Sequence, residues 1–432
     1  MSEIRNKADL FDEIIKSKKL EKYTYTISES EKQEVNLADG DFKLMRTVFG
    51  GSASIKVFKG TKMGSVNGND LSREGLEKLV SDGVLAAESA PEDPCNDFGP
   101  DQGKDVFRQG AEAADMDKFI ERIKEFLDTV EKEYPLVNLM EVVASFDKWH
   151  WISRNTNGTE FEGIGGQYSF SVTVSSNDGE NNTGIDGTGF VTTDLDKPFI
   201  EMADVKLILE NSQKSLKPEN VNGKFEGTLV LMPGSTANFI GMTLQNYAGS
   251  GVIIDGTSLW LDKVGEKVAN DKLTVSLKSS DERIAMGEKA TQDGYRAEDV
   301  TIIDKGVLKT HMLNLYASKK TGRPMIKNTS FDLVVEPGDV SFDEMIASID
   351  KGLLLGRFSG GQPGTNGEFS GVAKNSFLIE KGKITCAVNE TMVNGNLGEA
   401  LKNIRSISKE LICDGSTVVP FIAVDGIIIS GK

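Results

Sequence analysis

Histidine and cysteine, the residues that most often carry metal and nucleophilic chemistry, are scarce in this sequence. The chain of 432 residues contains two histidines, His150 and His311, and three cysteines. A zinc site usually takes three or four ligands from cysteine, histidine and carboxylates, and a serine or cysteine nucleophile usually needs a histidine base. The one zinc set left open is Cys413 with one histidine and an acidic residue. A turn before the last strands is the more ordinary interpretation of Cys413.

The cysteines also lie far apart, at Cys95, Cys386 and Cys413. An odd and widely spaced set does not suggest a disulfide framework, so it predicts a reducing compartment. The segment MSEIRNKADLFDEII lacks an apolar core flanked by basic residues, and we therefore expect no secretory signal. No apolar run approaches the length of a membrane-spanning helix. These features predict a cytoplasmic protein with no membrane partner.

Positive charge is in short supply as well. Lysine and arginine total 49 against 66 aspartates and glutamates, which gives a formal net charge of −17. A protein that binds DNA or RNA needs clustered cations to neutralise phosphates. The densest basic run, KSKKLEK near the start, is short. We therefore expect no direct contact with nucleic acid.

Common catalytic and nucleotide-binding motifs are missing too. Residues 356–382, GRFSGGQPGTNGEFSGVAKNSFLIEKG, are rich in glycine but contain neither the Gly-Lys step of a Walker loop nor a Gly-x-Gly-x-x-Gly run. A strand rather than a helix follows the loop, so no helix N-terminus would face an anion. No Gly-x-Ser-x-Gly nucleophile elbow occurs in the chain. A flexible or cleft-lining loop is the better interpretation of this segment.

What the sequence does contain is a clear alternation of helical and extended patterns in its first half. Apolar residues at helical spacing predict helices over 7–20, 115–133 and 197–213, with Asp115 as the cap of the second, and Ser72 predicts a capped helix to about Glu88. Between the first two, alternating residues with turns at Asp39-Gly40 and Gly50-Gly51 predict an antiparallel meander.

The second half is predicted to be richer in strands. A buried strand at Thr228–Met232 leads into a helix capped near Ser235. Ser341 and Glu344 form a capping-box pattern, and Leu397, Leu401, Ile404 and Leu411 predict one more helix. The chain closes on an apolar hairpin that is expected to turn at Asp425-Gly426.

These elements do not follow a regular β-α-β order, which favours an α+β fold rich in antiparallel sheet. We expect two domains. Residues 1–193 would form an N-terminal mixed α/β domain around the antiparallel meander, and residues 194–432 a β-rich C-terminal domain with a few helices.

The C-terminal quarter of the chain resembles the TldD/PmbA family, also called modulators of DNA gyrase. The resemblance is carried by an ordered set of segments, NTSFDLVVEPGDVSFDEMIASIDKGLLL, GEFSGVAKNSFLIEKGKITCAV, VNGNLGEALKNI and GSTVVPFIAVDGIIISGK, over about residues 320–432. A weaker match, TLVLMPGSTANFIGMTLQNYAGSG, extends it back to about residue 228. The meander and helix of residues 22–88 are similar to the first domain of the family.

The resemblance also indicates which kind of subunit this chain is. TldD-like members carry His-Glu-x-x-x-His on a helix and a later cysteine as a zinc peptidase site, whereas PmbA- or TldE-like members lack the motif. Aligned on FIGMTLQNYAG, the motif positions hold Gly241, Met242 and Asn246, and Cys413 falls near the family cysteine. The resemblance therefore implies a PmbA/TldE-like chain with no catalytic residue, no metal ligand and no cofactor of its own.

By the same resemblance, the chain would pair with a TldD-like catalytic subunit that holds zinc, or with itself, as a dimer enclosing a chamber for unfolded peptide. The glycine-rich loop would then line that chamber or its interface, through Arg357, Gly360, Gly361, Asn366, Phe369 and Ser370.

Two other functions stay open from the sequence. One is a self-associating peptide-binding or scaffold protein with no protease partner. The other is an independent hydrolase that uses Cys413 or an unusual metal set, and it is disfavoured because the required residue types are scarce. The gyrase label implies a link to gyrase, but this acidic chain shows no feature for contacting DNA.

Overall fold

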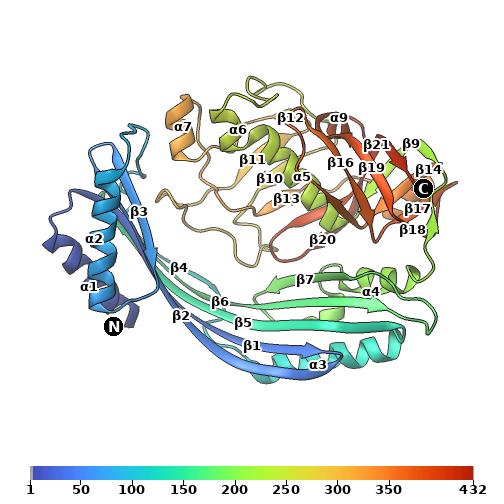
Figure 1. Ribbon diagram of the computed structural model, residues 1–432, viewed down its shortest axis with the longest axis horizontal. Helices are drawn as coiled ribbons and strands as arrows, with labels where there is room; N and C mark the ends of the chain where they lie inside the picture. The colour runs from blue at the N-terminus through green and yellow to red at the C-terminus, as the bar shows by residue number, and fades with distance from the viewer. Residues whose placement is uncertain (1–2, 432) are drawn as a thin grey trace.

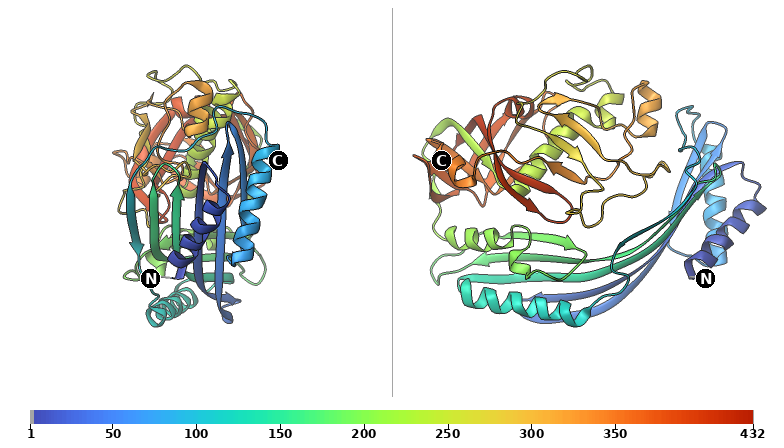
Figure 2. Two further views of the ribbon diagram at one scale, coloured as in Figure 1. Left: turned by 90° about the vertical axis from the view of Figure 1, so that its left-hand side faces the viewer. Right: turned by 180° about the vertical axis from the view of Figure 1, so that it is seen from behind.

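The computed structural model describes residues 3–431 as two β-sheets with helices packed on them. Figure 1 shows the first sheet as a long curved layer and the second part of the chain lying along it. The right-hand view of Figure 2 shows α3 on the side of the first sheet that faces away from the second part. In the part of the chain that the structure describes, no helix is long and apolar enough to cross a membrane. The α+β fold expected from the sequence is confirmed.

The first sheet has the strand order β3-β2-β1-β5-β6-β4, and β7 pairs with β6 beyond the end of β4. Its pairs are antiparallel except β4 with β6. The strands are β1 Lys22–Ala38, β2 Asp41–Lys59, β3 Lys62–Gly68, β4 Lys104–Gly110, β5 Val137–Asn155, β6 Glu160–Ser176 and β7 Asp186–Thr192. The helices of this part are α1 Glu3–Ser17, α2 Arg73–Ser89, α3 Met116–Glu133, the short 3-10 helix η1 Phe199–Glu201 and α4 Val205–Lys214.

Two separate cores cover this sheet. Phe11 of α1 and Val80 of α2 pack with strand residues such as Ile27 and Ile55, whereas Phe119 and Phe126 of α3 pack on Phe146 and Phe170 and their neighbours. The caps predicted for these helices are present, because Ser72 Oγ accepts a hydrogen bond from Gly75 N and Asp115 Oδ1 accepts one from Lys118 N.

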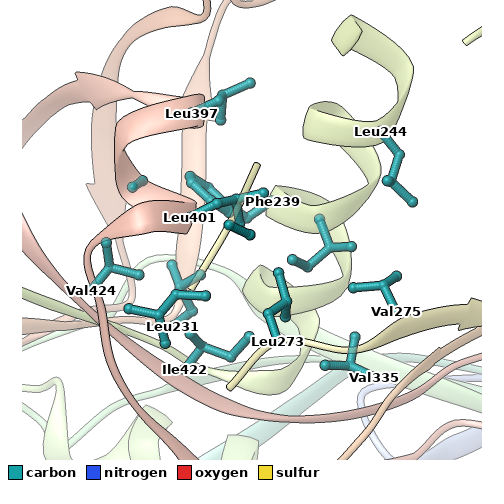
Figure 3. Packing of buried hydrophobic residues seen from close by; sticks show 14 of the residues in the cluster. Leu231, Phe239, Leu244, Leu273, Val275, Val335, Leu397, Leu401, Ile422 and Val424 are labelled. Atoms are coloured by element: carbon teal, nitrogen blue, oxygen red, sulfur yellow. The ribbon is translucent and has the colours of Figure 1, made fainter. Parts of the chain in front are cut away.

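The second sheet is built around β21, which pairs with β9, β13, β19 and β20. Its strands are β8 Glu219–Asn220, β9 Lys224–Leu231, β10 Val275–Leu277, β11 Val300–Asp304, β12 Val307–Leu308, β13 Leu333–Val335, β14 Lys351–Leu355, β15 Arg357–Gly360, β16 Glu368–Lys374, β17 Phe377–Glu380, β18 Lys383–Asn389, β19 Thr391–Asn396, β20 Ile404–Cys413 and β21 Val418–Ser430. Its helices are α5 Pro233–Ala248, α6 Ser250–Ile254, α7 Leu315–Thr321, α8 Phe342–Ala347 and α9 Leu397–Lys402. Figure 3 shows Phe239 and Leu244 of α5 facing the same core as Leu401 and Val424.

Several predicted boundaries in this half are wrong. The helix expected over Leu397–Leu411 stops at Lys402, and residues 404–413 form β20, because their backbone pairs with β21 instead. The expected hairpin at Asp425-Gly426 is a shift in register inside one long strand, β21. Helix α5 begins at Pro233 with Met232 as its cap residue, three residues before the predicted cap Ser235.

Two predictions in the first half also need correction. Gly50-Gly51 is not a turn but lies in the middle of β2, opposite Ser30 and Glu29 of β1. The helix expected over 197–213 begins only at Val205, after the short helix η1. The capping box of Ser341 and Glu344 is confirmed at the start of α8.

The chain crosses from one sheet to the other between Thr192 and Lys224. In this stretch Phe199, Val205 and Leu209 pack in the core of the first sheet together with α3. This packing favours a domain boundary after α4 over one at residue 193, and we propose the later boundary.

Loops of the second part hold it against the first sheet. Val191 N donates a hydrogen bond to Asp414 O at 2.8 Å, next to the end of β20. Near the end of β6 that begins at Glu160, Arg296 donates to Gln102 O at 2.6 Å and pairs with Asp105 at 3.0 Å. The two parts are thus joined by specific polar contacts at one end of the curved layer and near its middle.

Candidate functional site

Helix α5 is the element that would carry a metal motif in this fold. It follows β9, whose Leu229 and Leu231 lie in the core and pair with β14. Pro233 occupies the first helical turn, where its missing N–H costs nothing. The helix is therefore fixed at the end of a buried strand. Its partly exposed residues lie against the segment around Phe331 and against the loop between β15 and β16.

The three motif positions on α5 make ordinary packing contacts. A side chain added at Gly241 would place its Cβ 3.2 Å from the ring of Phe331, so the position is crowded. Met242 lines a small apolar crevice with Phe239, Phe358 and other residues. Asn246 Nδ2 donates a hydrogen bond to Gly364 O at 3.3 Å.

These side chains do not fit a zinc ion. At the two histidine positions, Gly241 offers no ligand atom and Asn246 offers only a weakly coordinating amide whose N–H is already bonded to the loop. At the glutamate position, the Met242 thioether cannot take a proton from a bound water. Among residues 3–431 no group of three or more His, Cys, Asp and Glu side chains is arranged to hold a metal ion. We therefore derive no metal-dependent step for this chain.

The two histidines are engaged elsewhere. His311 is buried, and its Nε2 lies 2.9 Å from Trp260 O. Burial lowers the pKa of His311, so the ring stays neutral at physiological pH. His150 lies in the first sheet with its Nε2 2.7 Å from Glu162 Oε1, and Glu162 also pairs with Arg5. His311 lies beside the C-terminal end of α5, where Met312 N donates to Ala248 O, but the contact of its ring is with Trp260 O and not with a motif position.

Cys413 ends β20, before the turn that leads to β21. Its thiol donates to Arg283 O at 3.1 Å, and the side chain is packed beside Val418. Burial raises the pKa of Cys413, which keeps the sulfur protonated. A protonated, partly buried thiol is a weak nucleophile.

The loop between β15 and β16 lies against the exposed side of α5. Tyr247 Oη donates to Asn366 O at 3.2 Å, and Gly367 has a φ of 85°, a conformation that favours glycine. A Cβ at Gly367 would also collide with Tyr247 Oη. These contacts hold the loop in one place beside the motif positions.

The six loop residues expected to line a chamber fall into two groups. Five are exposed to solvent, namely Arg357, Gly360, Gly361, Asn366 and Ser370. Phe369 is only 7% exposed and packs edge-on against Phe239 and Phe358 in the main core. Phe369 therefore supports the loop from beneath. Alternation along β16 places it on the opposite side from Ser370, but which side faces the core depends on contacts with Phe239 and Phe358.

Two partly buried carboxylates, Asp186 and Asp204, belong to no sequence motif and were not predicted. Burial raises the pKa of Asp204, whose carboxylate accepts a hydrogen bond from Thr188 Oγ1. Burial also raises the pKa of Asp186, which accepts a hydrogen bond from Asn375. Asp204 shares a small pocket with Asp414 and with Pro233 at the start of α5. Only the packing of the two parts against each other creates this environment.

Comparison with known proteins shows the family to which this chain belongs. Residues 26–87 match the model of PmbA/TldA metallopeptidase domain 1, and residues 224–431 match that of the PmbA/TldA metallopeptidase C-terminal domain. The chain is similar to a metalloprotease of Methanocaldococcus jannaschii, with 23% identity over 89% of each chain. The matched segments span both sheets, and the chain belongs to the PmbA/TldD family.

Solved structures show the same fold. TldE from Thermococcus kodakarensis superimposes with a TM-score of 0.82 at 19% identity, covering 98% of this chain and 100% of that one. A protein of Bacteroides thetaiotaomicron, described as a candidate modulator of DNA gyrase, superimposes with a TM-score of 0.84 at 22% identity, with both chains covered in full.

Proposed function

We propose that this chain is the non-catalytic, PmbA/TldE-like subunit of a TldD-type zinc metallopeptidase, and that it helps to enclose and position unfolded peptide. The observation that carries the proposal is which residues α5 has at the positions aligned with His-Glu-x-x-x-His, namely Gly241, Met242 and Asn246. Without imidazoles to hold zinc and a carboxylate to take a proton from bound water, the helix cannot activate water for hydrolysis.

The surroundings of α5 support a role in positioning. Asn246 and Tyr247 hold the loop between β15 and β16 through its backbone carbonyls, so the loop presents a fixed surface. Arg357, Asn366 and Ser370 offer polar groups on that surface. An extended peptide needs such groups for its backbone amides and carbonyls, since unpaired backbone groups are costly once water is excluded. Zinc and the catalytic side chains would come from the partner subunit.

The test is to mix the purified chain with a homologue that carries His-Glu-x-x-x-His. We expect the two to co-elute, zinc to be found only when the homologue is present, and cleavage of an unfolded protein to rise above that of the homologue alone. The variant Arg357→Ala should raise KM for peptide with kcat unchanged, as expected for a positioning residue. Lys383→Ala, another exposed cation on the second sheet, is the matched control.

Two results would count against this assignment. Tight binding of one zinc by the chain alone, with cleavage of unstructured peptides, would make it a peptidase in its own right. If the chain alone cleaves peptides and the variant Cys413→Ala does not, the peptidase activity belongs to the Cys413 thiol. Failure to co-elute with the homologue, with no change in its activity, would leave the second function, a self-associating peptide-binding protein.

A further inference from the structure

A groove of about 610 Å³ lies where α1 crosses the first sheet. It is formed by the first two turns of α1, by the middle of β1, β2 and β5, and by the segment that precedes α2. Figure 2 shows α1 at one end of this sheet and α3 toward the other. The volume falls within the range of about 300–1,000 Å³ that small-molecule sites usually have.

Most of the charges around the groove neutralise one another. Lys7 of α1 pairs with Glu29 of β1 and, at 3.2 Å, with Glu3. On β5 the ring of His150 is engaged by Glu162, its Nε2 lying 2.7 Å from the carboxylate. These groups satisfy each other, so they define the walls of the groove without offering a free charge to a ligand.

Two charges of the groove are left unmatched, namely those of Glu31 on β1 and Lys148 on β5. Both side chains are partly buried and line the groove. Glu31 Oε1 accepts a hydrogen bond from Gln33 Nε2 at 3.0 Å. Within residues 3–431 neither Glu31 nor Lys148 forms an ion pair. A carboxylate accepts several hydrogen bonds and an ammonium donates three, so both groups keep unused capacity.

The register of the sheet places these two residues directly opposite each other. Glu31 pairs with Lys148 in the antiparallel ladder of β1 and β5. Opposite residues of such a ladder share one face, with Cβ atoms about 4.5–5.5 Å apart. An ion pair between them would therefore be within reach, yet their charged ends do not meet. A negative and a positive group are thus both open to a ligand in the groove.

An apolar side chain stands next to this pair of charges. Phe49 of β2 lies opposite Glu31 on the other side of β1 and lines the groove with 76% of its surface exposed. Across three neighbouring strands, the groove therefore presents an apolar ring, a carboxylate and an ammonium in that order. Leu71, from the segment before α2, adds a second apolar side chain.

We propose that this groove binds a small zwitterion, an α-amino acid or a short peptide with both termini free and an apolar side chain. The α-ammonium group would pair with Glu31, the carboxylate with Lys148, and the apolar side chain would cover Phe49. A simple anion would meet the carboxylate of Glu31, and a simple cation would meet the ammonium of Lys148. Only a ligand that carries both charges satisfies both groups at once.

This inference goes beyond the proposed function and does not depend on it. The groove belongs to the first sheet, whereas α5 and its loop lie on the second. Binding of a zwitterion is measured on this chain alone, and association with a catalytic homologue is measured on the mixture. Failure of either idea therefore leaves the other standing.

The experiment is titration calorimetry of the full chain at neutral pH with four probes: leucine, leucyl-leucine, N-acetyl-leucine and leucinamide. N-acetylation removes the positive charge, and amidation removes the negative one. We expect one site per chain for leucine or leucyl-leucine, and the tighter of these two shows whether the ligand is an amino acid or a peptide. Each capped compound should bind at least about 10-fold more weakly than leucine, because one charged hydrogen bond is lost.

Variants then assign each charge to its residue. Glu31→Gln should lose the preference for leucine over N-acetyl-leucine and keep the preference over leucinamide. Lys148→Gln should show the reverse pattern. The matched controls Glu180→Gln and Lys18→Gln change exposed charges outside the groove and should keep both preferences. Melting temperatures confirm that the four variants are folded.

Three outcomes would overturn the proposal. The first is no binding of leucine or leucyl-leucine at millimolar concentration. The second is equal binding of free and capped probes, which would make the groove merely apolar, or a preference for one charge only, which would make it a site for a simple ion. The third is a pair of preferences that Glu31→Gln and Lys148→Gln leave unchanged, since the ligand would then bind elsewhere.

Discussion

Glycines beneath the tryptophans of the first sheet show how strongly single residues constrain this fold. Trp149 and Trp151 of β5 lie over Gly165 and Gly163 of β6, and a Cβ at either glycine would overlap the indole above it. The segment GIGG in β6 is therefore needed so that two large rings can lie across the sheet. From the sequence alone these glycines in a strand signalled only weak packing or a bulge.

We predict that Gly163→Ala destabilises the protein by about 1–3 kcal/mol, the usual cost of forcing extra volume into a packed site. The added Cβ would lie 2.2 Å from Trp151 Nε1, so the indole has to move. Chemical denaturation measures the loss, and a red shift of tryptophan emission reports the displaced ring. Gly184→Ala is the control, because it is exposed and no atom lies within 4 Å of its Cβ position; an equal loss there would refute the packing argument.

At the scale of an element, α3 was predicted from the sequence with almost its observed limits. Its apolar stripe, including Phe119, Ile123 and Phe126, is buried against the sheet, and Asp115 caps its first turn. Local pattern and cap agree here with the tertiary contacts, so the helix could be predicted without them.

Removing the Asp115 cap should therefore lower the stability of the protein measurably. Asp115→Ala leaves Lys118 N without its acceptor, and we expect a loss of about 1 kcal/mol in unfolding free energy. Asp115→Asn keeps an acceptor in the same place and should stay close to the parent value. Thermal and denaturant unfolding of the three proteins provide the measurement; equal losses in both variants would mean that charge, not capping, is responsible.

Other elements could not be predicted because their neighbours decide them. Residues 404–413 have helical spacing of apolar side chains but become β20, since β21 offers a partner along almost its whole length. Asp425-Gly426 has turn chemistry, yet β9 continues to pair with β21 on both sides of it. Local propensity is weak compared with the burial and hydrogen bonds of a central strand.

At the scale of the whole molecule, the contact between the two parts changes the chemistry of side chains at their boundary. Asp204 precedes α4, accepts a hydrogen bond from Thr188 and lines a pocket with Asp414 and the first turn of α5. Burial raises the pKa of Asp204, and the neighbouring Asp414 raises it further. The folded protein therefore binds the proton of Asp204 more tightly than the unfolded chain does.

The raised pKa of Asp204 determines the direction in which the stability of the folded protein changes with pH. The stabilisation linked to Asp204 is fully present below the carboxyl pKa of the unfolded chain, about 3.9, and is lost as the pH rises through the raised pKa of the folded state. Asp204→Asn cannot ionise, so its melting temperature should exceed that of the parent increasingly from acidic to neutral pH.

The matched control for that prediction is Asp196→Asn. Asp196 is exposed, and its hydrogen bond with Lys118 lowers its pKa, the opposite direction. The melting temperature of Asp196→Asn should not exceed that of the parent at neutral pH. If the melting temperatures of Asp204→Asn and the parent differ by the same amount across the pH range, Asp204 is not the titrating group.

The sequence by itself determined the chemistry that α5 can and cannot perform, because ligand atoms belong to side chains and no fold can supply an imidazole to Gly241 or Asn246. It also determined the helices whose caps and apolar stripes are local, such as α2 and α3. Only the tertiary structure decided that Phe369 points into the core, that Asp204 is partly buried, and that, among residues 3–431, no strand pairs with the outer edge of β2 over residues 41–52. Those properties depend on which distant segments pack together, and the free energy of burial and strand pairing is not contained in any single stretch of the chain.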